Sequence, residues 1–296
     1  MANTSQWVEG ARPRTLPAAV APVLAGTGVA LHADSAVWWK AALALVVALA
    51  LQVAVNYAND YSDGIRGTDS GRVGPLRLVG SGAASARRVK QAACMSFGVG
   101  AAAGLVLAAT TAWWLVAVGA VAMMAAWFYT GGSNPYGYSG FGEIGVFVFF
   151  GLVAVMGTAY VQTETLGGGI GWLSSVLGAG VGALACAILV ANNLRDIQTD
   201  ELAGKRTLAV VLGDDKTRGL FALLHGVAYA VSVIVSALMT GWLLLALLAV
   251  PLSGRALAVV RRRGAGPQLI PVLKDTGLAE LVYATGVFAG FLIASA

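Results

Sequence analysis

Apolar runs of about 20 residues recur along the whole chain, and they constrain its fold more than any other feature. A helix of that length, rising about 1.5 Å per residue, crosses the roughly 30 Å hydrocarbon core of a bilayer. Of the 296 residues, 58% are apolar and 11% are charged, whereas soluble domains carry about a quarter charged residues. A soluble enzyme is therefore excluded, and we expect an all-α polytopic membrane protein. Nine windows are predicted to form its transmembrane helices, namely 16–32, 37–58, 91–111, 114–130, 143–163, 172–194, 218–239, 242–260 and 276–295.

The connections between these windows alternate in length. Those after the second, fourth, sixth and eighth windows are 32, 12, 23 and 15 residues long, and the others are only a few residues long. The long connections and the N-terminus therefore share one face, which carries 18 of the 19 Lys and Arg residues; Lys40 is the exception. Because positive charge gathers on the cytoplasmic side, this face is predicted to be cytoplasmic in a multi-pass protein of the cell membrane. The net charge of +5 then reflects topology in a lipid bilayer, and no nucleic-acid partner is expected.

Two acidic segments follow the second and sixth windows. Each places an asparagine four residues before an aspartate, with a second aspartate three or four residues further on. Residues at these spacings share one helix face. Carboxylates at the edge of hydrocarbon need a cation or a functional role, and hard oxygen ligands suit Mg²⁺ together with phosphate oxygens. The sequence therefore predicts a cytoplasm-facing cavity among the helices, with Mg²⁺ bound by Asp60, Asp63, Asp196 and Asp200.

Polar side chains around these aspartates are predicted to bind the substrate. Arginine can hold phosphate oxygens bidentately, and lysine can hold them as a point charge. The predicted set consists of Asn56, Asn59, Arg66, Arg72, Arg77, Asn192, Lys205 and Arg206. The two acidic segments also suggest one domain over residues 1–296 that contains two weakly similar halves, about 1–130 and 131–296.

The two acidic segments resemble the aspartate-rich motifs of a known family. Asn59-Asp60-x-x-Asp63 and Asp196-x-x-x-Asp200 are similar to the two motifs of the UbiA superfamily of intramembrane aromatic prenyltransferases. Gly67 stands where many members carry the last aspartate of an Asp-x-x-x-Asp element, and Asp69 is a candidate substitute. Further stretches resemble the 1,4-dihydroxy-2-naphthoate polyprenyltransferases of menaquinone synthesis, particularly the actinobacterial type: 10–17, 67–69, 74–79, 129–132, 142–143, 192–196 and 274–277.

This resemblance implies an enzymatic activity. The family joins a polyprenyl diphosphate to an aromatic ring with Mg²⁺ as cofactor, and the subfamily uses 1,4-dihydroxy-2-naphthoate and releases carbon dioxide and diphosphate to give demethylmenaquinol. A dry cavity protects the allylic cation from water, and the ring face of Tyr129 is expected to stabilise that cation. The candidates for holding the acceptor carboxylate are Arg12, Arg14, Arg77 and Lys274.

The sequence is also compatible with two other functions. The first is a prenyltransferase for another aromatic acceptor, such as 4-hydroxybenzoate. The second is a transporter for a lipid diphosphate, because intramembrane acids also occur in carriers. The position of both acidic segments on one side of the membrane, rather than at its midplane, argues against a carrier.

Overall fold

The computed structural model describes residues 2–67 and 76–296, and each of the nine predicted windows contains helix. The long helices are α2 (Pro17–His32), α3 (Trp38–Arg66), α4 (Ala86–Thr110), α5 (Trp114–Phe128), α8 (Ile170–Leu202), α10 (Asp214–Leu238) and α12 (Ile270–Ala294). Two further long helical segments are each made of consecutive elements. The first consists of α6 (Gly142–Val146), the π-helical turn η3 (Phe147–Val153) and α7 (Ala154–Thr163). The second consists of η4 (Gly241–Ala249) and α11 (Val250–Arg261). The short elements are α1 (Thr4–Gly10), η1 (Pro13–Thr15), η2 (Tyr136–Tyr138), α9 (Leu208–Leu212) and η5 (Gly266–Leu269).

The helices are those of a multi-pass membrane protein. Within the described residues, 7 helical segments are long and apolar enough to cross a membrane. The segments Thr4–Thr15 and Pro17–His32, which meet at a bend of 47°, make an eighth if they form one span. With 15 residues, α5 is shorter than a full span. The prediction of an all-α membrane protein is therefore confirmed, and nine spans stay a prediction.

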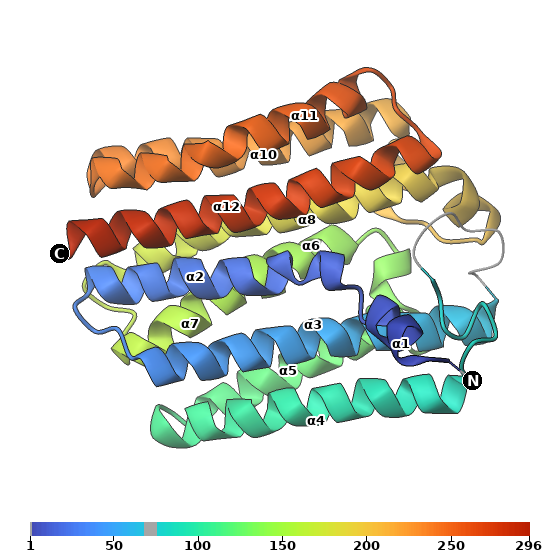
Figure 1. The fold of residues 1–296 in the computed structure, drawn as a ribbon, viewed down its shortest axis with the longest axis horizontal. Coiled ribbons are helices and arrows are strands. Elements are labelled where there is room, and N and C mark those ends of the chain that lie inside the picture. Colours follow the sequence, from blue (N-terminus) through green and yellow to red (C-terminus); the bar gives the residue numbers. More distant parts are fainter. Residues whose placement is uncertain (1, 68–75) are drawn as a thin grey trace.

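The helices lie side by side along the long axis of the molecule (Figure 1). The connections after α2, α4, α7 and α10 gather at one end. The N-terminus, α1 and the links from α8 to α10 and from α11 to α12 lie at the opposite end, which we call the loop end (Figure 1). The arrangement matches the alternation of short and long connections along the sequence.

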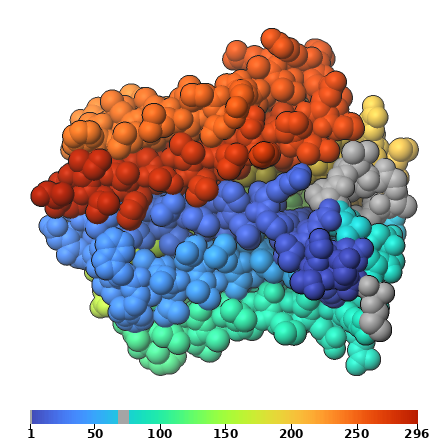
Figure 2. All heavy atoms as spheres, in the orientation of Figure 1, coloured from blue at the N-terminus to red at the C-terminus, as the bar shows by residue number. Residues whose placement is uncertain are grey.

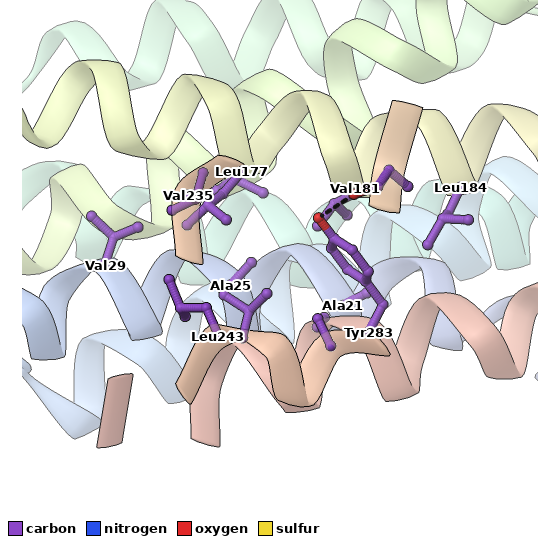
Figure 3. Close-up of a cluster of buried hydrophobic side chains, with 14 of the residues drawn as sticks. Ala21, Ala25, Val29, Leu177, Val181, Leu184, Val235, Leu243 and Tyr283 are labelled. Carbon is purple, nitrogen blue, oxygen red and sulfur yellow. Dashed lines mark hydrogen bonds between the residues drawn. The ribbon is translucent and has the colours of Figure 1, made fainter. Parts of the chain in front are cut away.

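Small residues allow the helices to approach closely in the core. The main apolar cluster brings together α2, α7, α8, α10, η4 and α12, and Figure 3 shows how Ala21 and Ala25 leave room for Leu243 and Tyr283. The buried Tyr283 hydroxyl donates a hydrogen bond of 3.1 Å to the carbonyl oxygen of Ala228. Such packing is usual where lipid removes the hydrophobic drive for association between helices.

The end opposite the loop end is tied together by Lys40, the one cation outside the predicted cytoplasmic face. Its ammonium group is buried and lies 2.7 Å from the Glu164 carboxylate. It also donates hydrogen bonds to the Thr110 carbonyl and the Thr111 hydroxyl, at 3.2 and 3.1 Å. Lys40 therefore has a local structural role, joining the start of α3 to the ends of α4 and α7.

The N-terminal helix α1 covers the end of α3 at the loop end. The Tyr57 hydroxyl donates a 2.8 Å hydrogen bond to the carbonyl oxygen of Trp7, and the two rings meet edge to face at 5.7 Å. Figure 2 shows this helix in dark blue, at the end of the molecule away from the C-terminus. The chain then turns through η1 into α2, which positions the residues of η1 beside the acidic segments.

Candidate active site

A polar cavity of about 790 Å³ lies at the loop end of the bundle. Its walls come from η1, α3, the 76–81 segment, the loop after α5, α8, the turn after α8 and α12. Both acidic segments therefore contribute to one space, as the sequence predicts. The charged and amide side chains that line this polar cavity are Glu9, Arg12, Arg14, Gln52, Asn59, Asp63, Arg77, Asn192, Asn193, Arg195, Asp200, Lys205 and Lys274.

Asp63, one turn before the end of α3, joins several of these walls. Its side chain is buried, and Arg77 Nη2 lies 3.4 Å from Oδ2. Lys205 Nζ lies 3.5 Å from Oδ1, and the Tyr138 hydroxyl donates a hydrogen bond to the same oxygen. One carboxylate thus contacts the segment after α3, the loop after α5 and the turn after α8.

The second acidic segment reaches the same point through Lys205. Helix α8 ends at Leu202, and Gly204 turns the chain with a φ of 74°, a conformation that glycine adopts without strain. The Lys205 amide then donates a 2.8 Å hydrogen bond to the carbonyl oxygen of Asp200. This turn places Lys205 Nζ 4.0 Å from the Asp200 carboxylate and 3.5 Å from that of Asp63, so the ammonium group lies between the two carboxylates.

The other two predicted aspartates bind groups of the protein. Asp60 is buried and accepts hydrogen bonds from the backbone amides of Leu78 and Val79, at 2.7 and 3.0 Å. Asp196 is buried and accepts two 2.7 Å hydrogen bonds from the guanidinium group of Arg195. The structure therefore brings Asp63 and Asp200 together at the polar cavity, whereas Asp60 holds the segment after α3 and Asp196 pairs with its neighbour Arg195 within α8.

The predicted asparagines have different surroundings. Asn56 donates 2.9 Å hydrogen bonds to the carbonyl oxygen of Ala11 and the hydroxyl of Thr15, which fixes the N-terminal segment against α3. Asn59 accepts a 2.8 Å hydrogen bond from the Thr130 hydroxyl. Asn192 lines the polar cavity and accepts a 2.8 Å hydrogen bond from Arg195.

Two other predicted basic residues, Arg66 and Arg206, form hydrogen bonds with the backbone of the loop after α5. Arg66 is exposed and donates hydrogen bonds to the carbonyl oxygens of Thr130 and Gly132. The Arg206 side chain is exposed, and its backbone amide donates to the carbonyl oxygen of Tyr138 at 2.8 Å. Arg72 and Asp69 lie outside the described residues.

An apolar cavity of about 350 Å³ adjoins the polar one. Its walls are mainly small, branched aliphatic and aromatic side chains of α2, α3, α4, α5, α6, η3 and α7. Asn59 and Tyr129 line both cavities, so the two spaces meet at these residues. There the Tyr129 ring meets the Tyr136 ring edge to face at 5.4 Å. Burial raises the pKa of Tyr136 to about 12, so this phenol stays neutral at physiological pH.

The polar cavity has suitable donors for a hard divalent cation. Among the described residues, no group of three or more His, Cys, Asp or Glu side chains could enclose a metal ion. Mg²⁺ does not need one, because it usually takes one or two carboxylates and completes its shell with water and substrate phosphates. Asp63 and Asp200, which share the Lys205 ammonium group, are the candidates for that pair of carboxylates.

Sequence reasoning missed Tyr138 and Arg195. Tyr138 ends the short turn η2 in the connection between α5 and α6, so no spacing along a common helix relates it to an aspartate. Arg195 stands directly before Asp196, and neighbouring residues on a helix ordinarily point in different directions. Its bidentate contact with Asp196 depends on how the long side chain folds back.

The model of the UbiA prenyltransferase family matches residues 19–268. The chain belongs to the UbiA prenyltransferase family. It is 58% identical to the 1,4-dihydroxy-2-naphthoate octaprenyltransferase of Mycobacterium tuberculosis, over 97% of each chain. It is 36% identical to the enzyme of the same name from Escherichia coli, over 97% of this chain and 96% of that one. The resemblance to the actinobacterial type is thereby confirmed.

Solved structures of UbiA homologues share the fold. The apo structure of a UbiA homologue from Aeropyrum pernix aligns with a TM-score of 0.72 at 16% identity, over 94% of this chain and 97% of that chain. A UbiA homologue from Archaeoglobus fulgidus bound to GPP and Mg²⁺ aligns with a TM-score of 0.62 at 14% identity, over 97% and 99% of the two chains. The helical architecture of this UbiA member is therefore that of its family.

Proposed function

We propose that this prenyltransferase moves a polyprenyl group from polyprenyl diphosphate to 1,4-dihydroxy-2-naphthoate, with loss of diphosphate and carbon dioxide, to form demethylmenaquinol. One observation carries the proposal: a cavity with carboxylates and cations opens into an apolar cavity at Asn59 and Tyr129. A prenyl diphosphate has the same division into a charged head and an apolar chain. The choice of acceptor rests on relatives of that name, one of them 58% identical.

The diphosphate head would lie in the polar cavity. Arg77 and Lys205 would hold its oxygens, Arg77 through two parallel hydrogen bonds and Lys205 as a point charge. Asp63 and Asp200 would hold Mg²⁺, which when bound neutralises charge on the leaving diphosphate. Asp60 would act indirectly, because its hydrogen bonds to the backbone of Leu78 and Val79 hold the segment that carries Arg77.

The allylic carbon would lie where the two cavities meet. Tyr129 lines both of them, and its ring face can stabilise positive charge by about 2 kcal/mol or more in a dry site. The adjoining apolar cavity would limit the access of water, which would otherwise capture the cation. Because Tyr136 stays neutral beside Tyr129, the pair presents aromatic faces without a phenolate that could react with the cation.

The isoprenoid chain would continue into the apolar cavity and then into lipid. One wall of this cavity is α5, which has no buried residue of its own, and the facing wall includes Phe149 and Val153 of η3. Gly151 holds η3 tightly against α8, since a Cβ atom there would lie 2.6 Å from the carbonyl oxygen of Gly178 and from Gly182 Cα. This close packing leaves space on the α5 side, where the isoprenoid tail would leave the bundle sideways into lipid. The enzyme would therefore select only weakly for the length of the prenyl donor.

The acceptor carboxylate needs a cation in the polar cavity. Arg77 would bind the diphosphate, and the other candidates, Arg12, Arg14 and Lys274, line the wall formed by η1 and α12. The ring carbon that bears the carboxylate would attack the allylic cation. The bond to the carboxyl group then breaks, its electron pair returns to the ring, and carbon dioxide leaves without a separate catalytic acid.

An acceptor panel tests this proposal. Purified protein in detergent receives Mg²⁺, a polyprenyl diphosphate, and either 4-hydroxybenzoate or 1,4-dihydroxy-2-naphthoate labelled in the carboxyl carbon. We expect prenylated naphthoquinol without label, labelled carbon dioxide, and loss of both when EDTA removes the metal. Label retained in the product, or reaction with 4-hydroxybenzoate alone, would refute the acceptor. Diphosphate release in detergent would exclude a carrier, because transport requires closed vesicles.

A further inference from the structure

Tyr138 contacts both aspartate segments from a loop that belongs to neither. It ends the short turn η2 between α5 and α6 and lines the polar cavity. Its hydroxyl donates a hydrogen bond to Asp63 Oδ1, and the ammonium group of Lys205 lies 4.5 Å from the centre of its ring. Its carbonyl oxygen accepts a 2.8 Å hydrogen bond from the amide of Arg206. One residue thus joins the end of α3 to the turn after α8.

The loop around Tyr138 is held at several other points. The Gly137 amide donates a 3.0 Å hydrogen bond to the carbonyl oxygen of Tyr129, and the Thr130 hydroxyl donates to Asn59 at 2.8 Å. Arg66 binds the carbonyl oxygens of Thr130 and Gly132. Because these contacts do not involve the Tyr138 side chain, removal of its hydroxyl leaves the loop anchored to α3.

We propose that Tyr138 is a positioning residue that couples the two aspartate segments. The inference rests on the proposed function, in which Asp63 and Asp200 bind Mg²⁺ and Lys205 binds the diphosphate. The hydroxyl fixes one orientation of the Asp63 carboxylate through a charge-assisted hydrogen bond. The ring holds the Lys205 ammonium group by a cation–π contact, between carboxylates 3.5 and 4.0 Å away.

The hydroxyl and the ring have separable roles, which two substitutions distinguish. Tyr138→Phe removes the hydrogen bond to Asp63 and keeps the ring beneath Lys205. Tyr138→Leu removes both, together with the contact that the Arg66 guanidinium group makes with the ring, 5.5 Å from its centre. Since Asp63 is the proposed metal ligand and Lys205 the proposed diphosphate ligand, the first substitution affects the Mg²⁺ requirement. The second also affects donor binding at saturating Mg²⁺.

Calorimetric binding of geranyl S-thiolodiphosphate, an unreactive donor analogue, tests this separation without turnover. For Tyr138→Phe we expect the Mg²⁺ concentration at half-maximal binding to rise about tenfold, with near-normal affinity at saturating Mg²⁺. For Tyr138→Leu we expect the dissociation constant of the analogue to rise about tenfold even at saturating Mg²⁺. The matched control is Tyr160→Phe, because the Tyr160 hydroxyl accepts a hydrogen bond from Trp114 far from the polar cavity. A Tyr138→Phe protein with the wild-type Mg²⁺ requirement overturns the proposal.

A double substitution tests the route through Lys205. If the ring acts by holding this lysine, Tyr138→Leu should not weaken analogue binding further in a Lys205→Met protein. Additive losses would show that the ring acts elsewhere, and would contradict the proposal. Analogue binding requires no acceptor. A protein that binds the analogue as described but does not prenylate the naphthoate would refute the proposed acceptor alone, and a wild-type protein that does not bind the analogue would refute the donor site itself.

Discussion

At the scale of single residues, the four aspartates divide into two kinds. Asp63 and Asp200 line the polar cavity and share the Lys205 ammonium group. Asp60 and Asp196 are buried against donors of the protein, two backbone amides in one case and the Arg195 guanidinium in the other. We expect both kinds to be needed for activity, and removal of the charge to lower activity to a different extent in each.

Asparagine substitutions measure this difference. Asp63→Asn should lower transfer by more than a hundredfold, since its carboxylate lines the polar cavity, and it should also lower stability, because Arg77 and Lys205 lose this carboxylate as a partner. Asp60→Asn turns an amide NH₂ group toward a backbone donor, so it should lower activity below a tenth and cost about 2 kcal/mol of stability. Activity assays and unfolding midpoints in detergent measure both effects.

The control for this pair is Asp34→Asn. Asp34 lies in the exposed turn after α2 with a φ of 50°, which asparagine adopts readily. The Asp34→Asn substitution should leave activity and stability unchanged. If the Asp63→Asn protein keeps a tenth of the wild-type rate, Asp63 is not a ligand in the donor site.

At the scale of helices, glycine determines how closely α12 approaches η4. A Cβ atom on Gly286 would lie 2.5 Å from the backbone of Leu245 and Ala246, and one on Gly290 would lie 2.7 Å from the Trp242 carbonyl oxygen. Backbone cannot yield as a flexible side chain can. These glycines therefore set the distance between the two helices on which the main apolar cluster depends.

Alanine substitutions test this packing. Gly286→Ala should force α12 away from η4 and destabilise the protein by about 1–3 kcal/mol. Gly226→Ala is the matched control, because a Cβ atom on this glycine of α10 has no neighbour within 4 Å. It should be neutral or stabilise the helix by up to about 1 kcal/mol. Equal unfolding midpoints for the two variants would show that the close approach of α12 to η4 does not limit the stability of the protein.

At the scale of the whole molecule, the two ends differ in chemistry. The loop end carries the polar cavity and nearly all the cations, and the other end carries short turns and the Lys40–Glu164 pair. This asymmetry supports the proposal that the N-terminus and the polar cavity face the cytoplasm. The diphosphate and the acceptor would then both enter from the cytoplasm.

Cysteine labelling in intact cells tests this orientation. In a background with Cys94 and Cys186 replaced, single cysteines are placed at exposed sites in the two ends: Ser5 and Ala203 at the loop end, Asp34 and Thr165 at the other. A membrane-impermeant maleimide should label the Asp34→Cys and Thr165→Cys proteins in intact cells. It should reach the other two only after lysis, and the reverse pattern would invert the topology.

The sequence by itself determined the helical segments, the shared end of the long connections, the family and the two acidic helix ends. The helices and the acidic helix ends follow from local rules, since apolar run length sets a span and helical period sets which residues share a face, whereas the family follows from the resemblance of the motifs. Asp60 and Asp63 are three residues apart, yet one binds backbone and the other lines the polar cavity. Only the tertiary structure decided this, because helical period says which residues share a face but not what lies opposite it. The contact of Tyr138 with Asp63, 75 residues away along the chain, likewise depends on how the connection between α5 and α6 packs against α3.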